Sequence, residues 1–182
     1  MLTLAFNVQS VKASGTIYIR ADGSIDPPTA PIQRDGDTYT LTGNITSDGD
    51  GIVIERNNAT FDGAGYTVQG TEPWNSKGVY LSGRSKATIK NMEIKAFGYG
   101  ICLYWSSNYN SISGIHITAN NQGIQLSESS NNTIFGNKIT NNYGNGILLS
   151  FSSKNNTISG NNITNNSFGI QLYYSSGNSI SR

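Results

Sequence analysis

The sequence of 182 residues is short of charge and of cysteine. Only 13% of its residues are Asp, Glu, Lys or Arg, about half of the roughly 25% found in an average protein. The formal net charge is +1, so electrostatics gives no reason to expect nucleic acid or an anionic membrane as a partner. The single cysteine, Cys102, excludes an intrachain disulfide and a cysteine-based zinc site.

Long apolar runs are also missing, and none approaches the roughly 18 residues of a transmembrane helix. The length suits one domain with a substantial core. The first residues resemble the second half of a secretory signal peptide, with the small residues Val11 and Ala13 before a cleavage site at Ser14. The alternative is an apolar first strand. We interpret residues 1–13 as a signal-peptide remnant, which predicts a secreted, extracellular or cell-surface protein.

Asn, Ser, Thr and Gly take the place of charged residues, and they recur in a repeat. From Gly78 onward the phrase Gly-aliphatic-x-Leu returns in steps of 22 or 23 residues, and an earlier copy, GIVI, begins 27 residues before Gly78. Two further aliphatic columns keep this spacing, so each unit holds three short stretches separated by turns rich in Asn, Gly and Ser. Asn suits such turns, because it tolerates a left-handed backbone and can bond to an Asn stacked above it. The phrase begins at Gly51, Gly78, Gly100, Gly123, Gly146 and Gly169.

Apolar and polar residues alternate within each stretch, as in Ile115-His116-Ile117, which indicates strands. Such short strands can bury their apolar sides only by stacking, with like residues about 4.8 Å apart in successive turns. A leucine-rich repeat would need a segment able to coil over its convex side, and a left-handed hexapeptide helix would need an aliphatic residue at every sixth position. Neither is present. The sequence therefore predicts an all-β fold, a right-handed parallel β-helix of about six turns over residues 51–182.

The two ends depart from the repeat. Residues 14–50 contain strand-like stretches and a loop without the Gly phrase, so we predict an N-terminal cap there. At the other end the sequence stops part way through a turn, at Arg182, without a capping segment. Either the natural protein continues or another chain covers this edge. End-to-end self-association through the uncapped turn is therefore one expected partnership.

The repeated pattern GIxL…SSxNNTIxGNxIxNN, preceded by ATFDGAGYTVQG, resembles the NosD-type, carbohydrate-binding and sugar-hydrolysis (CASH) class of right-handed β-helices. The resemblance covers residues 51–182 and implies an archaeal or bacterial secreted surface protein with a pectin-lyase-like fold. Folds of this kind host lyases, hydrolases, adhesins and spacers. The activity therefore has to be argued from a site.

Acidic residues suited to cleaving a glycosidic bond are sparse. An inverting glycosidase needs two carboxyl groups roughly 6.5–9.5 Å apart, yet Glu128 is the only acid beyond residue 95, and Glu55 lies three turns away from it. Neighbouring turns place Glu93 beside His116, a pair able in principle to transfer protons. A cross-strand pair that offsets outward charge explains the same two residues. We therefore predict no catalytic residue beyond these two candidates, and we favour a protein that is not an enzyme.

Soft metal ligands are equally sparse. Copper delivery, which the NosD name implies, would use Cys, Met or His, and only Met92, Cys102 and His116 remain once a signal peptide is removed. The stretch SDGDG at residues 47–51 has the composition of a calcium loop without the further carboxylates, which is typical of a turn. We predict no cofactor, with calcium at this turn as the alternative.

Aromatic residues are the remaining indication of a site. Several follow the Leu of the repeated phrase by one or two residues, so exposed rings would lie in register along one side of the solenoid. Such rings could stack on sugar rings, with Gln125 and Gln171 supplying hydrogen bonds. Alternatively the rings stack on one another and stiffen the solenoid. We predict that a polysaccharide or cell-surface glycan contacts Trp105, Phe151, Tyr174, Tyr104, Tyr173 and Glu128.

The sequence therefore favours a secreted or cell-surface β-helix module that binds carbohydrate without cleaving it, or serves as a scaffold. The first alternative is a polysaccharide lyase or glycoside hydrolase whose decisive residues lie elsewhere in a longer protein. The second is a NosD-like metal-assembly factor. Glycosylation is also expected in a secreted context, and the N-x-S/T sequons begin at Asn44, Asn58, Asn131, Asn155, Asn162 and Asn165.

Overall fold

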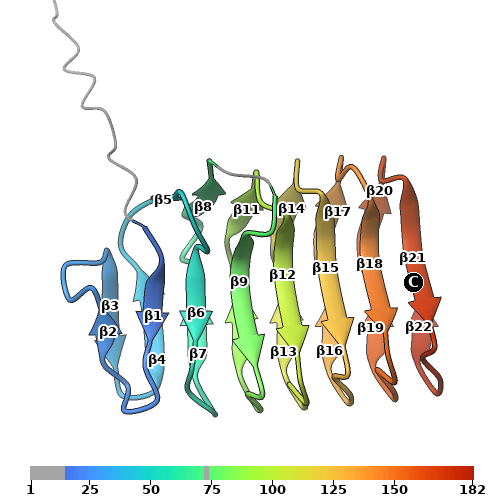
Figure 1. The fold of residues 1–182 in the computed structure, drawn as a ribbon, viewed down its shortest axis with the longest axis horizontal. Helices are drawn as coiled ribbons and strands as arrows, with labels where there is room; N and C mark the ends of the chain where they lie inside the picture. The colour runs from blue at the N-terminus through green and yellow to red at the C-terminus, as the bar shows by residue number, and fades with distance from the viewer. Residues whose placement is uncertain (1–14, 72–73) are drawn as a thin grey trace, which may run out of the picture.

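The structure, a computed structural model, describes residues 15–71 and 74–182 (Figure 1). The signal-peptide remnant expected at residues 1–13 lies outside the described part. Within the described part every regular element is a β-strand, which confirms the all-β prediction. No helix there is long and apolar enough to cross a membrane.

The strands stack into three sheets that run the length of an elongated solenoid (Figure 1). Sheet A, at the front of Figure 1, has the order β2 (Ile25–Asp26), β1 (Ile17–Ile19), β6 (Ile52–Ile54), β9 (Lys77–Ser82), β12 (Tyr99–Tyr104), β15 (Gln122–Ser127), β18 (Asn145–Ser150) and β21 (Phe168–Tyr173).

The other two sheets lie behind sheet A. Sheet B has the order β22 (Ser179–Ser181), β19 (Thr157–Ser159), β16 (Thr133–Phe135), β13 (Ser111–Ser113), β10 (Thr88–Lys90), β7 (Thr60–Asp62), β4 (Thr38–Leu41) and β3 (Ile32–Asp35). Sheet C has the order β20 (Asn162–Thr164), β17 (Lys138–Thr140), β14 (His116–Thr118), β11 (Glu93–Lys95), β8 (Thr67–Gly70) and β5 (Ile45–Ser47).

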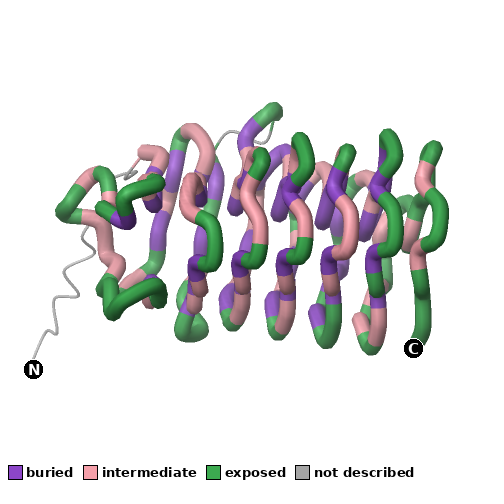
Figure 2. Tube along the Cα trace, turned by 90° about the horizontal axis from the view of Figure 1, so that it is seen from below, coloured by how far each residue is buried: buried purple, intermediate pink, exposed green. Residues whose placement is uncertain are grey.

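The core is formed by columns of equivalent residues from successive coils. Ile101 pairs with Ile124 and Leu103 with Leu126 in parallel register, and all four side chains are fully buried. Figure 2 shows buried residues recurring at equivalent places in successive coils, while the last coil is largely exposed. Burying each such side chain contributes roughly 1.5–3 kcal/mol, so the repeated aliphatic positions are the main source of stability.

The segment expected to be a cap forms a coil of its own. Its strands β1, β4 and β5 pair in parallel with β6, β7 and β8, and β2 and β3 add antiparallel strands at that end. The solenoid thus begins before Gly51. This coil lacks the Gly phrase, and its core column is filled by Tyr39 in register with Phe61. The Tyr39 hydroxyl donates to the Gly23 carbonyl, so a buried tyrosine can replace an aliphatic residue there.

The two residues of a repeated asparagine pair have different structural roles. In the pair Asn141-Asn142, the first residue adopts a left-handed backbone with φ of 58°. The second is buried, and its Oδ1 accepts from the Asn120 backbone N–H at 3.0 Å. The Asn142 N–H donates in turn to Asn166 Oδ1 at 2.9 Å. Asparagine ladders therefore satisfy the turn backbone along the axis, as the sequence predicts.

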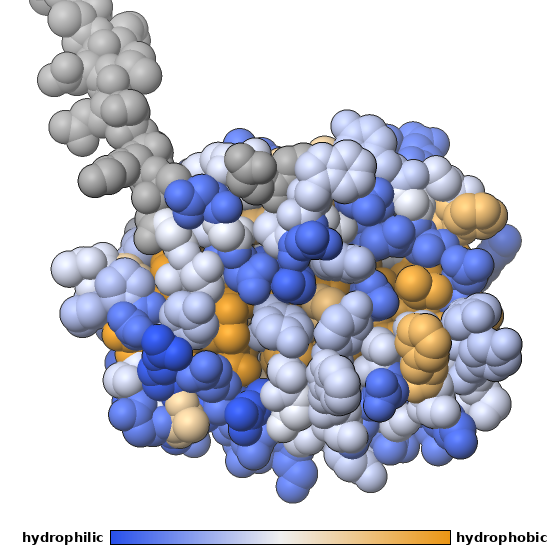
Figure 3. Space-filling view, viewed as in Figure 1, coloured by the Kyte–Doolittle hydropathy of each residue, from blue (hydrophilic) through white to orange (hydrophobic). Residues whose placement is uncertain are grey.

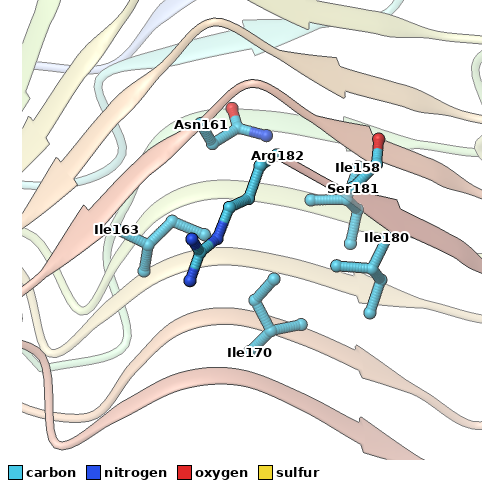
Figure 4. Close-up of a pocket in the computed structure, with 7 residues that line it drawn as sticks. All are labelled: Ile158, Asn161, Ile163, Ile170, Ile180, Ser181 and Arg182. Atoms are coloured by element: carbon cyan, nitrogen blue, oxygen red, sulfur yellow. The ribbon is translucent and has the colours of Figure 1, made fainter.

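The apolar core is uncovered at the last coil. A depression of about 240 Å³ opens there, and the Arg182 side chain lies across it (Figure 4). Ile180, in the last coil, is 49% exposed. At the other end of the solenoid, β2 and β3 cover the first coil. The depression is lined by Ile158, Asn161, Ile163, Ile170, Ile180, Ser181 and Arg182.

Candidate functional site

The outward side chains of β12, β15, β18 and β21, with the turn residue that follows each strand, form one continuous surface, which we call the sheet A face. Figure 3 is viewed from this side of the molecule. Parallel register aligns its residues in columns along the solenoid axis. The columns are Tyr99, Gln122, Asn145 and Phe168; Cys102, Gln125, Leu148 and Gln171; Tyr104, Ser127, Ser150 and Tyr173; and Trp105, Glu128, Phe151 and Tyr174.

The turn column has a left-handed backbone, as other turns of the solenoid also do. Trp105, Phe151 and Tyr174 adopt φ angles of 55°, 48° and 50°, and Glu128 has 52°. The equivalent residue one coil earlier is Gly83, with φ of 64°. Because this left-handed conformation is easily adopted by glycine and is an outlier for bulky residues, the turn itself does not favour aromatic residues.

The aromatic residues predicted from the sequence fall into two groups on this face. Phe151, Tyr173 and Tyr174 contact one another, with ring centroids 5.7 Å apart for the first two and 4.3 Å apart for the last two. Tyr104 contacts Tyr80 of β9 at 6.3 Å. Trp105 is 65% exposed and has no ring partner among the described residues. Mutual stacking therefore accounts for some rings and leaves Trp105 free to meet a ligand.

Polar side chains separate the two aromatic groups. Gln125, Asn145 and Ser150 point outward from the sheet, yet they are only 8%, 6% and 2% exposed, because larger neighbours surround them. The Gln122 side-chain carbonyl accepts from the Asn145 backbone N–H at 2.8 Å. Asn145 Oδ1 is buried without a hydrogen-bond partner in the described structure. The sequence analysis missed Asn145, which occupies the position just before the Gly of the repeated phrase.

Cys102 lies in the floor of the same face and is fully buried. Burial raises the pKa of the Cys102 thiol to about 12, because the charged thiolate is disfavoured away from water. A thiol of this kind stays protonated at neutral pH. It is therefore suited neither to nucleophilic attack nor to binding a metal ion.

Glu93 and His116 lie side by side on the outer surface of sheet C, as the repeat predicts. Glu93 Oε1 is 3.7 Å from His116 Nδ1, while Glu93 Oε2 accepts from Lys95 Nζ at 2.8 Å and from Thr67 Oγ1 at 3.0 Å. The bond from Lys95 lowers the pKa of the Glu93 carboxyl.

The His116 pKa is also lowered, first by partial burial and then by the nearby Lys138 ammonium. At neutral pH the pair therefore holds a carboxylate and a neutral imidazole. The Glu93 carboxyl has no proton to donate to a leaving group under these conditions, so the local geometry fits a charge cluster on the sheet surface better than an acid catalyst.

The expected soft metal ligands do not come together. Met92 is buried in the core, Cys102 lies on sheet A and His116 on sheet C. In the SDGDG turn, Asp50 Oδ1 accepts from the Lys77 backbone N–H at 2.8 Å and lies 3.7 Å from Lys77 Nζ. Over residues 15–71 and 74–182, no group of three or more His, Cys, Asp or Glu residues could hold a metal ion.

The sequons lie mostly at accessible turns. Asn131 is half-buried, and the other sequon asparagines are exposed, namely Asn44, Asn58, Asn155, Asn162 and Asn165. Glycosylation at these positions stays a prediction.

Comparison with known proteins agrees with this architecture. The model of the family described as "Right handed beta helix region" matches residues 32–182. No curated protein gave a significant sequence match.

Two solved structures resemble the chain. An alginate lyase from Paenibacillus sp. str. FPU-7 is 20% identical, with a TM-score of 0.51, and the match covers 70% of this chain and 48% of that one. A mutant of the periplasmic alginate epimerase AlgG is 17% identical, with a TM-score of 0.39, and the match covers 80% of this chain and 44% of that one. The chain thus spans about half the length of each. The likeness to the lyase shows a shared fold.

Proposed function

This chain belongs to the right-handed β-helix family, and on that premise we propose that it is a secreted or cell-surface module that binds a polysaccharide on the sheet A face without cleaving it. Family membership leaves the activity open, because β-helices host many functions. The NosD-type resemblance of the repeat supports the surface location. The site itself supplies the argument for binding.

The observation that carries the proposal is the set of exposed aromatic residues in a turn column whose left-handed backbone favours glycine. A bulky residue in this conformation costs on the order of 1–3 kcal/mol. Trp105 and Tyr174 are 65% and 75% exposed, so the burial of their rings offsets little of this conformational cost. Gly83 fits the equivalent turn without strain. Contact with a ligand, and not a contribution to folding, explains why aromatic residues occupy these positions.

The chemistry of the face fits a sugar polymer. Exposed rings offer flat apolar surfaces, and the accessible polar side chains of Gln122, Ser127 and Gln171 offer hydrogen bonds that fix orientation. From β12 to β21 is three strand spacings, or about 14 Å, a length that covers several sugar units. Glu128 is the only acid on the face, so the paired carboxylates of a glycosidase are missing from it. We therefore propose binding without hydrolysis.

Replacing Trp105 by glycine tests the proposal, because the two interpretations predict different results. The Trp105→Gly variant relieves the left-handed backbone, so we expect its free energy of unfolding to stay within about 1 kcal/mol of the wild type. We expect its retention on insoluble polysaccharides to fall at least tenfold. The measurements are a binding panel and urea unfolding of wild type and variant.

Trp74→Ala is the matched control, because Trp74 is 77% exposed and lies outside the sheet A face. Retention of this control should equal that of the wild type. A folded Trp105→Gly protein that binds as well as the wild type would overturn the proposal. Strong destabilisation of Trp105→Gly would instead assign the ring a structural role.

We also propose that the open end of the last coil pairs with the same end of a second copy. The other end is covered by antiparallel strands, and Arg182 is the only charged residue lining the depression at this one. An apolar strand edge with so little charge favours association. We expect sedimentation velocity to show a dimer whose fraction rises with concentration. Ile180→Lys should abolish it, and a wild-type monomer at every concentration would contradict the pairing.

A further inference from the structure

The sheet A face carries almost no charge. Glu128 is the only charged residue among its positions, and it lies between Trp105 and Phe151 in the turn column. A polymer that carries a carboxylate on every sugar unit would therefore meet a negative charge on this face and no cation. At separations of a few ångströms such repulsion is sizeable near a protein surface.

The nearest cationic side chains lie beside the sheet A face. Lys77 of β9 is 3.7 Å from Asp50 and stands over the Tyr80 ring at 5.4 Å, so its charge is already balanced. Arg84 and Lys154 lie in the turns that lead from sheet A to sheet B. Lys77 continues the Tyr99 column one coil before the face begins, and Arg84 and Lys154 lie outside the columns.

Resting on the proposed function, we infer that the sheet A face takes a neutral, hydroxyl-rich glycan and discriminates against polyuronates. The aromatic groups at β12 and β21 provide the stacking surfaces, and the amide and hydroxyl side chains between them form the floor. Glu128 is the residue that repels an acidic polymer.

The test compares the affinities of five soluble polysaccharides for the purified chain. Mixed-linkage glucan, xylan and galactomannan are neutral, while alginate and polygalacturonate are polyuronates. We expect at least one neutral polymer to bind tenfold or more tightly than either polyuronate. We expect its affinity to be unchanged by added salt, because no ion pair is involved. Glu128→Gln should strengthen binding of the polyuronates several-fold relative to binding of the neutral polymers.

Tighter binding of a polyuronate than of every neutral polymer would overturn the inference and leave the proposed function standing. Binding of none of the five would overturn both.

Discussion

The Gly123→Ala variant is expected to lose about 3 kcal/mol of its free energy of unfolding, the upper end of the range for overpacking a core. A β-carbon at Gly123 would lie 2.3 Å from the Gly146 carbonyl oxygen and 2.9 Å from the Ile139 Cγ2 atom. The oxygen belongs to the backbone of the next coil, so it cannot move aside without disturbing the parallel ladder. Urea unfolding followed by circular dichroism measures the loss.

Gly169→Ala is the matched control for this prediction. Gly169 occupies the same column in the last described coil, and its nearest atom to a new β-carbon is Ile163 Cγ2 at 4.0 Å. We expect this variant to unfold within about 0.5 kcal/mol of the wild type, as surface substitutions usually do. If both alanine variants lost the same stability, close approach between coils would not be the reason for the repeated glycine.

The Asn142→Ala variant is the second change with a large expected effect, again about 3 kcal/mol. The Asn142 side chain accepts from the Asn120 backbone N–H at 3.0 Å and donates to the Ile117 carbonyl at 3.2 Å. Both groups lie inside the solenoid, out of reach of water. Each buried group left without a partner costs roughly 1–3 kcal/mol.

The neighbouring residue provides the control for the ladder. Asn141 is exposed, and its φ of 58° suits glycine. Asn141→Gly should change the free energy of unfolding by no more than about 0.5 kcal/mol, because its role is backbone geometry. A large loss in Asn141→Gly with little loss in Asn142→Ala would reverse the roles assigned to the two residues and contradict the ladder.

The repeat made the fold predictable from the sequence. A period of 22 or 23 residues with three aliphatic columns fixes which residues stack, and the register of Glu93 with His116 confirms it. The first coil was harder to recognise. It has no Gly phrase, and it fills the core with Tyr39 in place of an aliphatic residue. A buried tyrosine depends on a partner for its hydroxyl, and that partner, the Gly23 carbonyl, lies in a distant turn.

The candidate site was predictable only in part. The spacing after each Leu placed Trp105, Phe151 and Tyr174 in one column, but nothing in the residue types indicates a left-handed backbone beneath them. Asn145 was missed, because a polar residue before a glycine is typical of any turn. Its burial arises from the side chains of neighbouring coils, and the unpaired Oδ1 is a property of the assembled stack.

The surroundings of Glu93 could also be predicted from the sequence only in part. Its neighbour His116 follows from the repeat, whereas the bonds from Lys95 and Thr67 depend on side-chain directions across adjacent strands. These bonds decide the chemistry, since they hold the carboxyl ionised. The sequence could therefore identify Glu93 and His116 as neighbours, but it could not predict the protonation state of either side chain.

The most direct test of the account is to map the bound polysaccharide onto the chain by NMR. ¹⁵N-labelled protein would be titrated with hexasaccharide fragments of mixed-linkage glucan, xylan and galactomannan. We predict shifts at the amides of β12, β15, β18 and β21 and at the Trp105 indole N–H. Shifts clustered around Glu93 and His116 on sheet C, or no shifts with any of the three, would contradict binding on the sheet A face.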